Sequence, residues 1–285
     1  MILIADSGST KTDWCLADDK QVVGRWTTAG INPVHQTDEQ IEQTVDSLID
    51  SIEKIVGIEA ISAIAFYGAG CTPAQQPRMR NLLLKRLKSV AVCEVAGDML
   101  GAARAVCGSS EGIACILGTG ANSCLYDGRM MVQNTPPLGY ILGDEGSGAV
   151  LGRLFINALY KGRLPQSLRE DFEREAGLTM GDVIDRVYRQ PLANRFLAST
   201  SLFISRHLDV EPLRQLVIGN FRQFFRLNVV PYGRTDLPVG FVGSMAFHYE
   251  QELREAAAQE GFKVGTVVKS PMEGLLAYHV NAVNV

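Results

Sequence analysis

The chain opens with Ile2-Leu3-Ile4-Ala5-Asp6-Ser7-Gly8-Ser9-Thr10-Lys11, an apolar run that ends in a carboxylate and a polar turn containing glycine. A second apolar run (12–17) follows that turn, and a third candidate strand (21–28) follows a turn of two aspartates and a lysine. Short apolar runs separated by such turns predict a β-hairpin extended by a third strand. Three adjacent strands are therefore expected to begin the fold.

Alternating strand and helix patterns follow this opening. From Asp38 the apolar residues recur at helical spacing, with Thr37 or Asp38 as the expected N-cap. Further strands are predicted at 61–66 and 90–95, and further helices at about 74–88 and from Asp98. The alternation predicts an α/β lobe that ends near residue 108.

A second round repeats the plan of the first. The apolar run 113–117 turns at Gly118-Thr119-Gly120 and returns through 122–126. Two such openings predict two lobes, 1–108 and 109–285, although their sequences share negligible identity. The second lobe is expected to contain a helical segment (about 146–231), a strand at 238–242, a helix near 247–260, a strand at 264–268 and a terminal helix from about Met272. That last helix could pack on the first lobe.

Three glycine-containing turns are candidate nucleotide contacts. A glycine lets backbone N–H groups approach phosphate oxygens, and the hydroxyls and lysine of the first turn add donors and positive charge. The second turn could contact the other side of a triphosphate. The third, Gly243-Ser244, joins a strand to a helix expected near Ala246 and could pack against a nucleobase and ribose. For the first and third, the alternative is a structural turn: a solvated hairpin for the first and a serine-capped βα turn for the third.

Carboxylates stand beside these turns. Asp6, at a strand end, could hold Mg²⁺ through water, because magnesium keeps several of its own water ligands. Asp98 follows a buried strand and could accept the proton of an attacking hydroxyl, with helix N-cap as its structural alternative. Asp144 and Glu145 lie in Gly143-Asp144-Glu145-Gly146-Ser147-Gly148, just before a helix whose N-terminus they could stabilise electrostatically.

Composition excludes several other classes. The balance of 27 Lys+Arg against 31 Asp+Glu gives a net charge of -4, which offers no broad attraction to nucleic acid or to an anionic membrane. The six cysteines have no CxxC spacing, so buried thiols in a reducing cytoplasm are favoured over a disulfide frame or a metal cage. The N-terminus lacks the pattern of a secretory signal, and no apolar run is long enough to span a bilayer.

In order and spacing, these motifs resemble those of the actin, hexokinase and Hsp70 superfamily. Within it the chain looks most like the N-acetylglucosamine kinases grouped with the BadF/BadG/BcrA/BcrD ATPases, and Leu142-Gly143-Asp144-Glu145-Gly146-Ser147 is the most distinctive stretch. The resemblance implies two ribonuclease H-like lobes, with ATP and Mg²⁺ in an interlobe cleft that closes around a sugar. It also allows a homodimer.

The resemblance also implies a role for individual residues. Asp6 would position hydrated Mg²⁺, and Asp98 would be the catalytic base at a sugar hydroxyl. The ATP contacts would be Gly8, Ser9, Thr10, Lys11, Gly118, Thr119, Gly120, Gly243 and Ser244. The sugar contacts would be Asn32, Asp98, Asp144 and, by a looser match, Gly68.

The expected activity is therefore transfer of the γ-phosphoryl group of ATP to an amino sugar, with the 6-hydroxyl of N-acetylglucosamine as the first candidate acceptor. Glucosamine and N-acetylmuramic acid are alternatives. Two other functions stay open: an ATPase that activates a dehydratase or reductase through an iron–sulfur cluster, and a sugar or nucleotide sensor without enzymatic activity. The cluster would need closely placed thiolates, which the cysteine positions do not favour.

Overall fold

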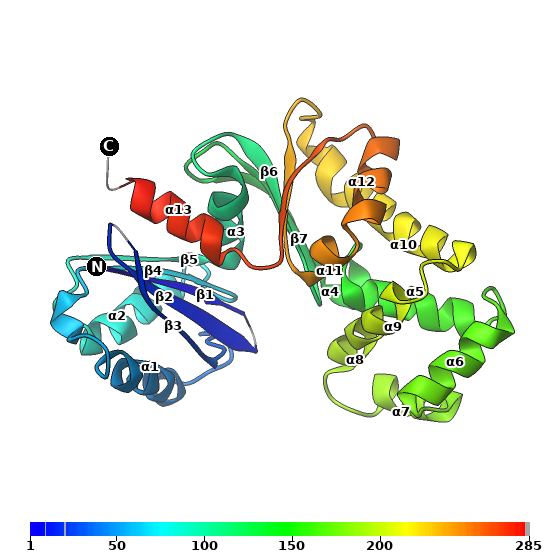
Figure 1. Cartoon of the computed structure of the whole chain (residues 1–285), viewed down its shortest axis with the longest axis horizontal. Coiled ribbons are helices and arrows are strands. Elements are labelled where there is room, and N and C mark those ends of the chain that lie inside the picture. Colours follow the sequence, from blue (N-terminus) through cyan, green and yellow to red (C-terminus); the bar gives the residue numbers. More distant parts are fainter. Residues whose placement is uncertain (9, 20, 283–285) are drawn as a thin grey trace. The chain divides into compact units, whose positions relative to one another are not determined.

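The structure is a computed structural model that describes residues 1–8, 10–19 and 21–282 (Figure 1). The chain divides into two compact units, each containing one five-stranded mixed sheet. Unit 1 comprises Met1–Ser110, Gly128–Met130 and the chain from Pro271 onward, and unit 2 comprises Glu111–Asp127 and Met131–Ser270. The predicted α/β class with two sheets is confirmed.

Unit 1 has the strand order β3-β2-β1-β4-β5. Its strands are β1 (Ile2–Ser7), β2 (Lys11–Ala17), β3 (Val22–Ala29), β4 (Ala63–Gly68) and β5 (Val92–Gly97). The first three strands are antiparallel, as predicted, and β4 and β5 continue the sheet in parallel.

Helices cover both faces of this sheet, as Figure 1 shows. One face packs against α1 (Asp38–Ile52) and α2 (Gln76–Arg86) through Leu3, Ala5, Trp14 and Leu16. The other face packs near α3 (Asp98–Cys107) and against α13 (Met272–Ala282) through Ile4 and Cys15. The terminal helix therefore lies with the first unit.

The start of α1 follows the predicted capping pattern. The hydroxyl of Thr37 accepts a hydrogen bond from the Gln40 N–H, and the Gln40 side chain accepts one from the Thr37 N–H. This reciprocal pair satisfies two N–H groups that the helix itself leaves unpaired. Thr37, one of the two predicted N-caps, is therefore the cap.

Two predicted strands lie two residues later than expected. The run at 61–66 becomes a strand only from Ala63, because buried Ile61 ends the 3₁₀ turn η1 (Ile58–Ala60). Likewise β5 starts at Val92 rather than Val90 and ends at Gly97. The shift brings Asp98 directly to the strand end, with no intervening turn.

Unit 2 has the strand order β10-β9-β6-β7-β8. Its strands are β6 (Gly112–Leu117), β7 (Ala121–Tyr126), β8 (Met131–Thr135), β9 (Val239–Val242) and β10 (Val264–Val268). Read from β8, this is the order of the first sheet, since in each case an antiparallel three-stranded meander is followed by two parallel strands. The predicted repeat of plan is confirmed.

The predicted helical segment separates β8 from β9. The short helix α4 (Gly139–Leu142) precedes it. The segment itself contains α5 (Gly148–Tyr160), α6 (Gln166–Ala176), α7 (Met180–Tyr188), α8 (Ala193–Ser199), α9 (Ser201–Ser205), α10 (Glu211–Phe224), the π-helical turn η2 (Phe225–Val229) and η3 (Val230–Tyr232). The predicted helix at 247–260 is instead two helices, α11 (Ser244–His248) and α12 (Glu250–Gln259). They separate at buried Tyr249, whose hydroxyl donates to the Ser201 carbonyl.

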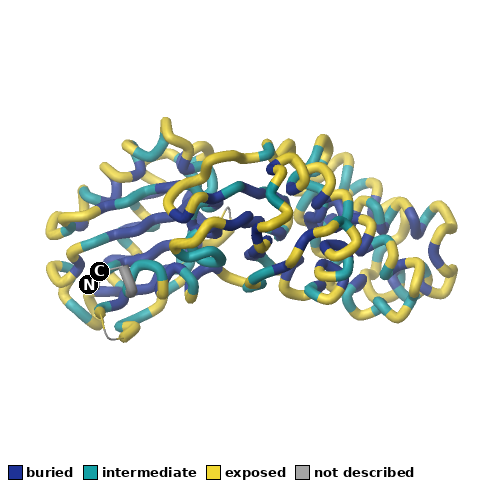
Figure 2. Tube along the Cα trace, turned by 90° about the horizontal axis from the view of Figure 1, so that it is seen from above, coloured by how far each residue is buried: buried dark blue, intermediate teal, exposed yellow. Residues whose placement is uncertain are grey.

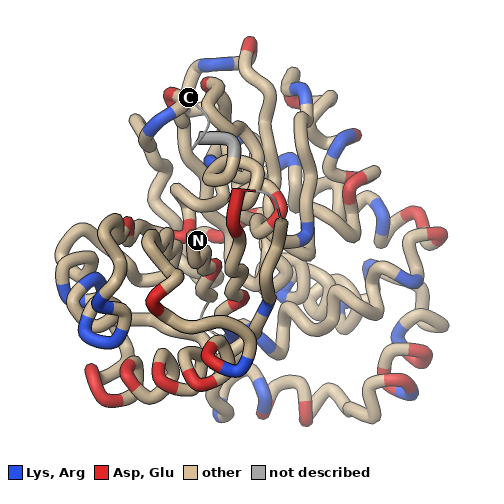
Figure 3. Tube along the Cα trace, turned by 60° about the vertical axis from the view of Figure 1, so that its left-hand side comes forward, with Lys and Arg blue, Asp and Glu red and all other residues tan. Residues whose placement is uncertain are grey.

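Buried residues follow the inner strands of each sheet, whereas β3 and β8 have none, and exposed residues are frequent in the loops and on the helices (Figure 2). Acidic and basic residues are interspersed over those outer faces (Figure 3), in keeping with the small net charge. Among the described residues, no helix combines the length and apolar character needed to cross a membrane.

Candidate functional site

An acidic cluster, formed by Asp6, Asp13 and Asp98, lies near the ends of β1 and β5 in unit 1. Asp6 and Asp13 are directly opposed in the β1–β2 register, and Asp98 follows β5. Alternation along β1 and β2 puts both strand aspartates on the sheet face that carries Ile4 and Cys15. Burial raises the pKa of Asp6 to about 7, with Asp98 and then Asp13 adding to the rise and Lys11 opposing it.

Asp98 is the first residue of α3, and its Oδ1 accepts a hydrogen bond of 2.9 Å from the Met99 N–H. The N-cap of this helix is Gly97, so the structural alternative that made Asp98 the cap is wrong. Burial raises the pKa of Asp98, while the N–H groups of Met99 and of Asp98 itself oppose the rise. A carboxyl with a raised pKa is a stronger proton acceptor once ionised.

The first glycine turn is closed by a 3.0 Å hydrogen bond from the Gly8 N–H to the Lys11 carbonyl. Gly8, Thr10 and Lys11 are exposed, whereas Ser9, also predicted to contact ATP, lies outside the described residues. Lys11 Nζ is 2.5 Å from Asp13 Oδ2, so the ammonium group is held on the side of the acidic cluster. Sequence reasoning missed Asp13, although hairpin pairing alone would have placed it opposite Asp6.

Hydrogen bonds fix the second glycine turn to the start of α5. The Gly118 N–H donates to the Gly120 carbonyl (3.0 Å), and the first N–H groups of α5, from Gly148 and Ala149, donate to the carbonyls of Gly118 and Thr119 (2.8 and 3.2 Å). A methyl group added at Gly118 would meet nothing within 4 Å. Helix α5 therefore holds the turn on one side, and the described residues leave the space beside the Gly118 Cα open.

Asp144 lies against this second turn. Its backbone is left-handed (φ 54°), and its Oδ2 is 3.0 Å from where a Cβ on Gly120 would stand. Burial raises the pKa of the carboxyl, and the N–H groups of Ala121 and Gly139 oppose the rise. The cap of α5 is Ser147, which accepts from the Val150 N–H, so Asp144 does not cap that helix.

Two asparagines that the sequence did not single out hold the loop containing Asp144. Asn220 is 2% exposed, and its amide accepts from the Gly146 N–H (3.0 Å) and donates to the Ser147 carbonyl (3.4 Å). Asn228, in the π-helical turn, donates to Glu145 (3.2 Å). Because both lie in helices far along the chain, no local pattern connects them with the loop.

The third turn packs on the second. Gly243 has φ 124° and ψ 162°, and a Cβ there would lie 2.3 Å from the Leu117 carbonyl oxygen. Helix α11 begins at Ser244 rather than near Ala246, and its N-cap is Gly243. The alternative in which Ser244 caps this helix is therefore wrong, and the exposed hydroxyl is left for other contacts.

The remaining predicted sugar contacts lie in unit 1. Asn32 Oδ1 accepts from the Val34 N–H (3.0 Å), while Nδ2 has no hydrogen-bond partner among the described residues. A Cβ on Gly70 (φ 78°) would lie 2.2 Å from Asn32 Oδ1, so the amide rests on this glycine. The space beside the Gly68 Cα is filled, since a Cβ there would meet the Phe66 ring and the Cys71 sulfur.

Comparison with known proteins identifies the family. No protein-family model matches the chain, and no curated protein matches it. A solved structure of a putative N-acetylglucosamine kinase from Porphyromonas gingivalis is 54% identical over 99% of each chain, with a TM-score of 0.94. The chain belongs to this N-acetylglucosamine kinase family. The resemblance inferred from the motifs is thereby confirmed.

More distant structures share the fold of this kinase family. A putative N-acetylglucosamine kinase from Chromobacterium violaceum is 20% identical, with 97% of this chain and 98% of that chain covered and a TM-score of 0.69. A ROK family glucokinase from Streptomyces griseus, in complex with glucose and AMPPNP, is 14% identical, with 99% and 98% covered and a TM-score of 0.57. The two-lobe architecture of the sugar kinases thus extends to this chain.

All six cysteines lie within the described residues and none forms a disulfide, and five of them are buried. Cys107 is half-buried, and burial raises its pKa to about 11. Burial likewise raises the pKa of Cys15, Cys71 and Cys93, so these three sulfurs and that of Cys107 stay in the thiol form. The prediction of buried thiols is confirmed, and the arrangement does not favour the activator ATPase.

Proposed function

We propose that the chain is an ATP-dependent kinase that transfers the γ-phosphoryl group to a hydroxyl of an N-acetylated amino sugar. N-acetylglucosamine is the first candidate substrate and its 6-hydroxyl the first candidate acceptor. The observation that carries the proposal is the 54% identity over 99% of the chain to the Porphyromonas gingivalis protein, whose name gives that substrate.

Asp98 would be the general base of this reaction. In this proposal Asp98 contacts the sugar and accepts the proton of the attacking hydroxyl. The hydroxyl oxygen can then attack the γ-phosphorus. The burial of Asp98 supports this role, because burial raises the pKa of the carboxyl. A carboxylate with a raised pKa accepts a proton more readily than one with an ordinary pKa. Its hydrogen bond from Met99 fixes the orientation of the carboxyl group on α3.

Asp6 would hold Mg²⁺, the ion that neutralises the charge of the ATP phosphates when bound. The donor chemistry fits, because Asp6 is a carboxylate, and a cation would stabilise the charged form that burial, and then repulsion by Asp98 and Asp13, disfavour. We expect contact through water, as Mg²⁺ commonly retains several of its waters.

The glycine turns would bind the nucleotide. Gly8, Thr10 and Lys11, with Ser9, would contact the β and γ phosphates, and the turn Gly118 to Gly120 of unit 2 would also contact the phosphates. Gly243 and Ser244 would contact the adenosine. The exposed Ser244 hydroxyl and the open space beside Gly118 support this assignment.

Asn32 and Asp144 would contact sugar hydroxyls, and Gly68 would lie beside the sugar with backbone groups only. The unpaired Nδ2 of Asn32 supports its role, because it is a donor available to an acceptor oxygen. ATP use leads us to expect a cytoplasmic location. A homodimer remains an expectation from the family resemblance, which sedimentation would test.

The test is ADP release with Mg-ATP against N-acetylglucosamine, glucosamine, N-acetylmuramic acid, N-acetylmannosamine, glucose and no sugar. The proposal predicts release that depends on sugar and is fastest with N-acetylglucosamine. Release without sugar would instead support an ATPase, and ATP binding with no turnover on any sugar would support a sensor.

A further inference from the structure

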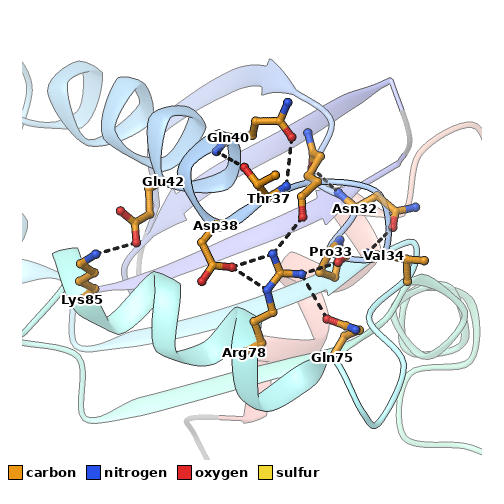
Figure 4. A network of polar contacts seen from close by, with 11 residues as sticks. Asn32, Pro33, Val34, Thr37, Asp38, Gln40, Glu42, Gln75, Arg78 and Lys85 are labelled. Carbon is orange, nitrogen blue, oxygen red and sulfur yellow. Dashed lines mark hydrogen bonds and ion pairs between the residues drawn. The ribbon is translucent and has the colours of Figure 1, made fainter.

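The loop that carries Asn32 is fixed at both of its ends. At the near end, buried Ser7 accepts from the Ile31 N–H and donates to the Ile31 carbonyl, both at 3.0 Å. At the far end, the guanidinium of Arg78, on α2, contacts the segment 33–38 (Figure 4). Asn32 lies between these two anchors.

All three nitrogens of the Arg78 guanidinium donate hydrogen bonds to this segment. Nη1 donates to the Pro33 carbonyl (2.5 Å), Nη2 donates to the Gln36 carbonyl (2.9 Å), and Nε donates to Asp38 (2.6 Å). A weaker contact joins Nη1 to Gln75 on its own helix (3.4 Å). One side chain thus satisfies two loop carbonyls and the first carboxylate of α1.

The chemistry of Asn32 itself fixes which way its amide points. The Val34 N–H requires an oxygen opposite it, so Oδ1 faces the loop and Nδ2 faces away. The backbone is held as well, since the Asn32 N–H donates to Gln36 Oε1 at 2.7 Å. The loop therefore presents one amide donor in a defined direction.

From this geometry we propose that Arg78 is a positioning residue for sugar recognition. By anchoring the carbonyls of Pro33 and Gln36, it holds the loop so that Asn32 presents Nδ2 to an acceptor oxygen of the sugar, a hydroxyl or the acyl carbonyl. This role rests on the proposed sugar kinase function. It requires the planar fork of arginine, because a lysine ammonium is a point charge that does not reproduce the same parallel contacts.

The chain contains a matched control. Arg86 also projects from α2 to an acid of α1, with Nε 3.0 Å from Asp46, and its side chain is exposed to a similar degree (46%, against 32% for Arg78). No contact of Arg86 with the loop 30–38 is found among the described residues. Arg86→Met therefore removes an interhelix ion pair while leaving the loop anchors in place.

The experiment compares Arg78→Met, Arg78→Lys and Arg86→Met at a temperature where all are folded. We expect Arg78→Met to raise the KM for N-acetylglucosamine by about 10-fold or more, the cost of one misplaced hydrogen bond, with the KM for ATP within about 2-fold. Arg78→Lys should not restore the sugar KM, and Arg86→Met should resemble wild type. Equal changes in Arg78→Met and Arg86→Met, or restoration by lysine, would overturn the proposal.

Amide hydrogen exchange of peptides covering 30–38 gives a readout that needs no activity. Exchange there should accelerate in Arg78→Met and not in Arg86→Met. If wild type phosphorylates none of the sugars, the proposed function fails while this measurement still decides whether Arg78 anchors the loop. Unchanged exchange in Arg78→Met would overturn the anchoring itself.

Discussion

The two sheets share one strand order, yet they differ in what surrounds the turn after their first strand. In unit 1 the second rung from the turn, meaning the second pair of directly opposed residues, is Asp6 with Asp13, and Lys11 adds an ammonium group. In unit 2 the corresponding rung pairs Ile116 with Asn122, neither of which is charged. The first turn is thus rich in ionisable groups, whereas the second offers mainly backbone groups.

The turns also differ in how they are held. The described part of the first turn is closed by the Gly8–Lys11 hydrogen bond, and its Thr10 carbonyl accepts from the Gly30 N–H, while the second turn is bonded to the start of α5 and packed by Asp144 and Gly243. In the proposed function, the groups that would carry charge through the reaction lie in unit 1, and the backbone groups that would bind phosphate lie in unit 2. One fold plan would then support two tasks, reaction chemistry and anion binding.

The largest effect should come from removing the proposed base. Asp98→Asn keeps the side-chain shape and the Met99 hydrogen bond, but it removes the group that takes the hydroxyl proton. A positioned base contributes about 10² to 10⁴ in rate, so kcat should fall by that order with the melting temperature nearly unchanged. Steady-state ADP release measures it. Turnover near wild type would remove Asp98 from this role.

A second change tests the rigidity of unit 2. Gly243→Ala puts a Cβ 2.3 Å from a backbone oxygen at φ 124°, a region that only glycine adopts readily. Strain and overlap should cost about 2 to 5 kcal/mol of unfolding free energy. Denaturant unfolding measures this loss. Gly261→Ala is the control, since it has φ 80° but no atom within 4 Å, and an equal loss in both would show that overlap with Leu117 is unimportant.

The sequence predicted the parts of this site that depend on local pattern. The apolar runs, the turns and the Thr37 cap follow from periodicity and short-range chemistry, and hairpin pairing would have added Asp13 beside Asp6. Helix starts near glycine were less exact, as at Ser244, because the left-handed or extended backbone of a glycine depends on what packs against it.

The other contacts that were missed join distant segments. Asn220 reaches the Gly146 loop across 74 residues, and Arg78 reaches Pro33 across 45. Each residue alone looks like a polar position on a helix. Only the tertiary fold gives them a partner, so local spacing could not have identified them.

The third prediction concerns stability and its dependence on pH. Burial, and then repulsion by Asp98 and Asp13, raise the pKa of Asp6 to about 7 in the fold, above its ordinary value of 3.8, so ionisation opposes folding. The destabilisation grows as pH rises through this window and is complete above about pH 7. Asp6→Asn should therefore raise the melting temperature by a few degrees at pH 8 and much less at pH 5, in protein without Mg²⁺.

Thermal unfolding of both proteins at the two pH values makes this comparison, and Mg-dependent activity of Asp6→Asn should fall at the same time. A gain in stability with a loss of activity would indicate that unit 1 keeps its acidic cluster for chemistry rather than for folding. Equal shifts at pH 5 and pH 8 would contradict the assignment of the pH effect to Asp6.

The smallest effect is expected at Lys11, and it separates binding from folding. Lys11 is 64% exposed, so its ion pair with Asp13 should contribute less than about 1 kcal/mol to stability. Lys11→Met should leave the melting temperature unchanged but raise the KM for ATP about 10-fold, because a phosphate contact is lost. Lys85→Met is the matched control, with 62% exposure and a 2.7 Å pair to Glu42. A similar KM change in both variants would mean that the first turn has no special part in binding ATP.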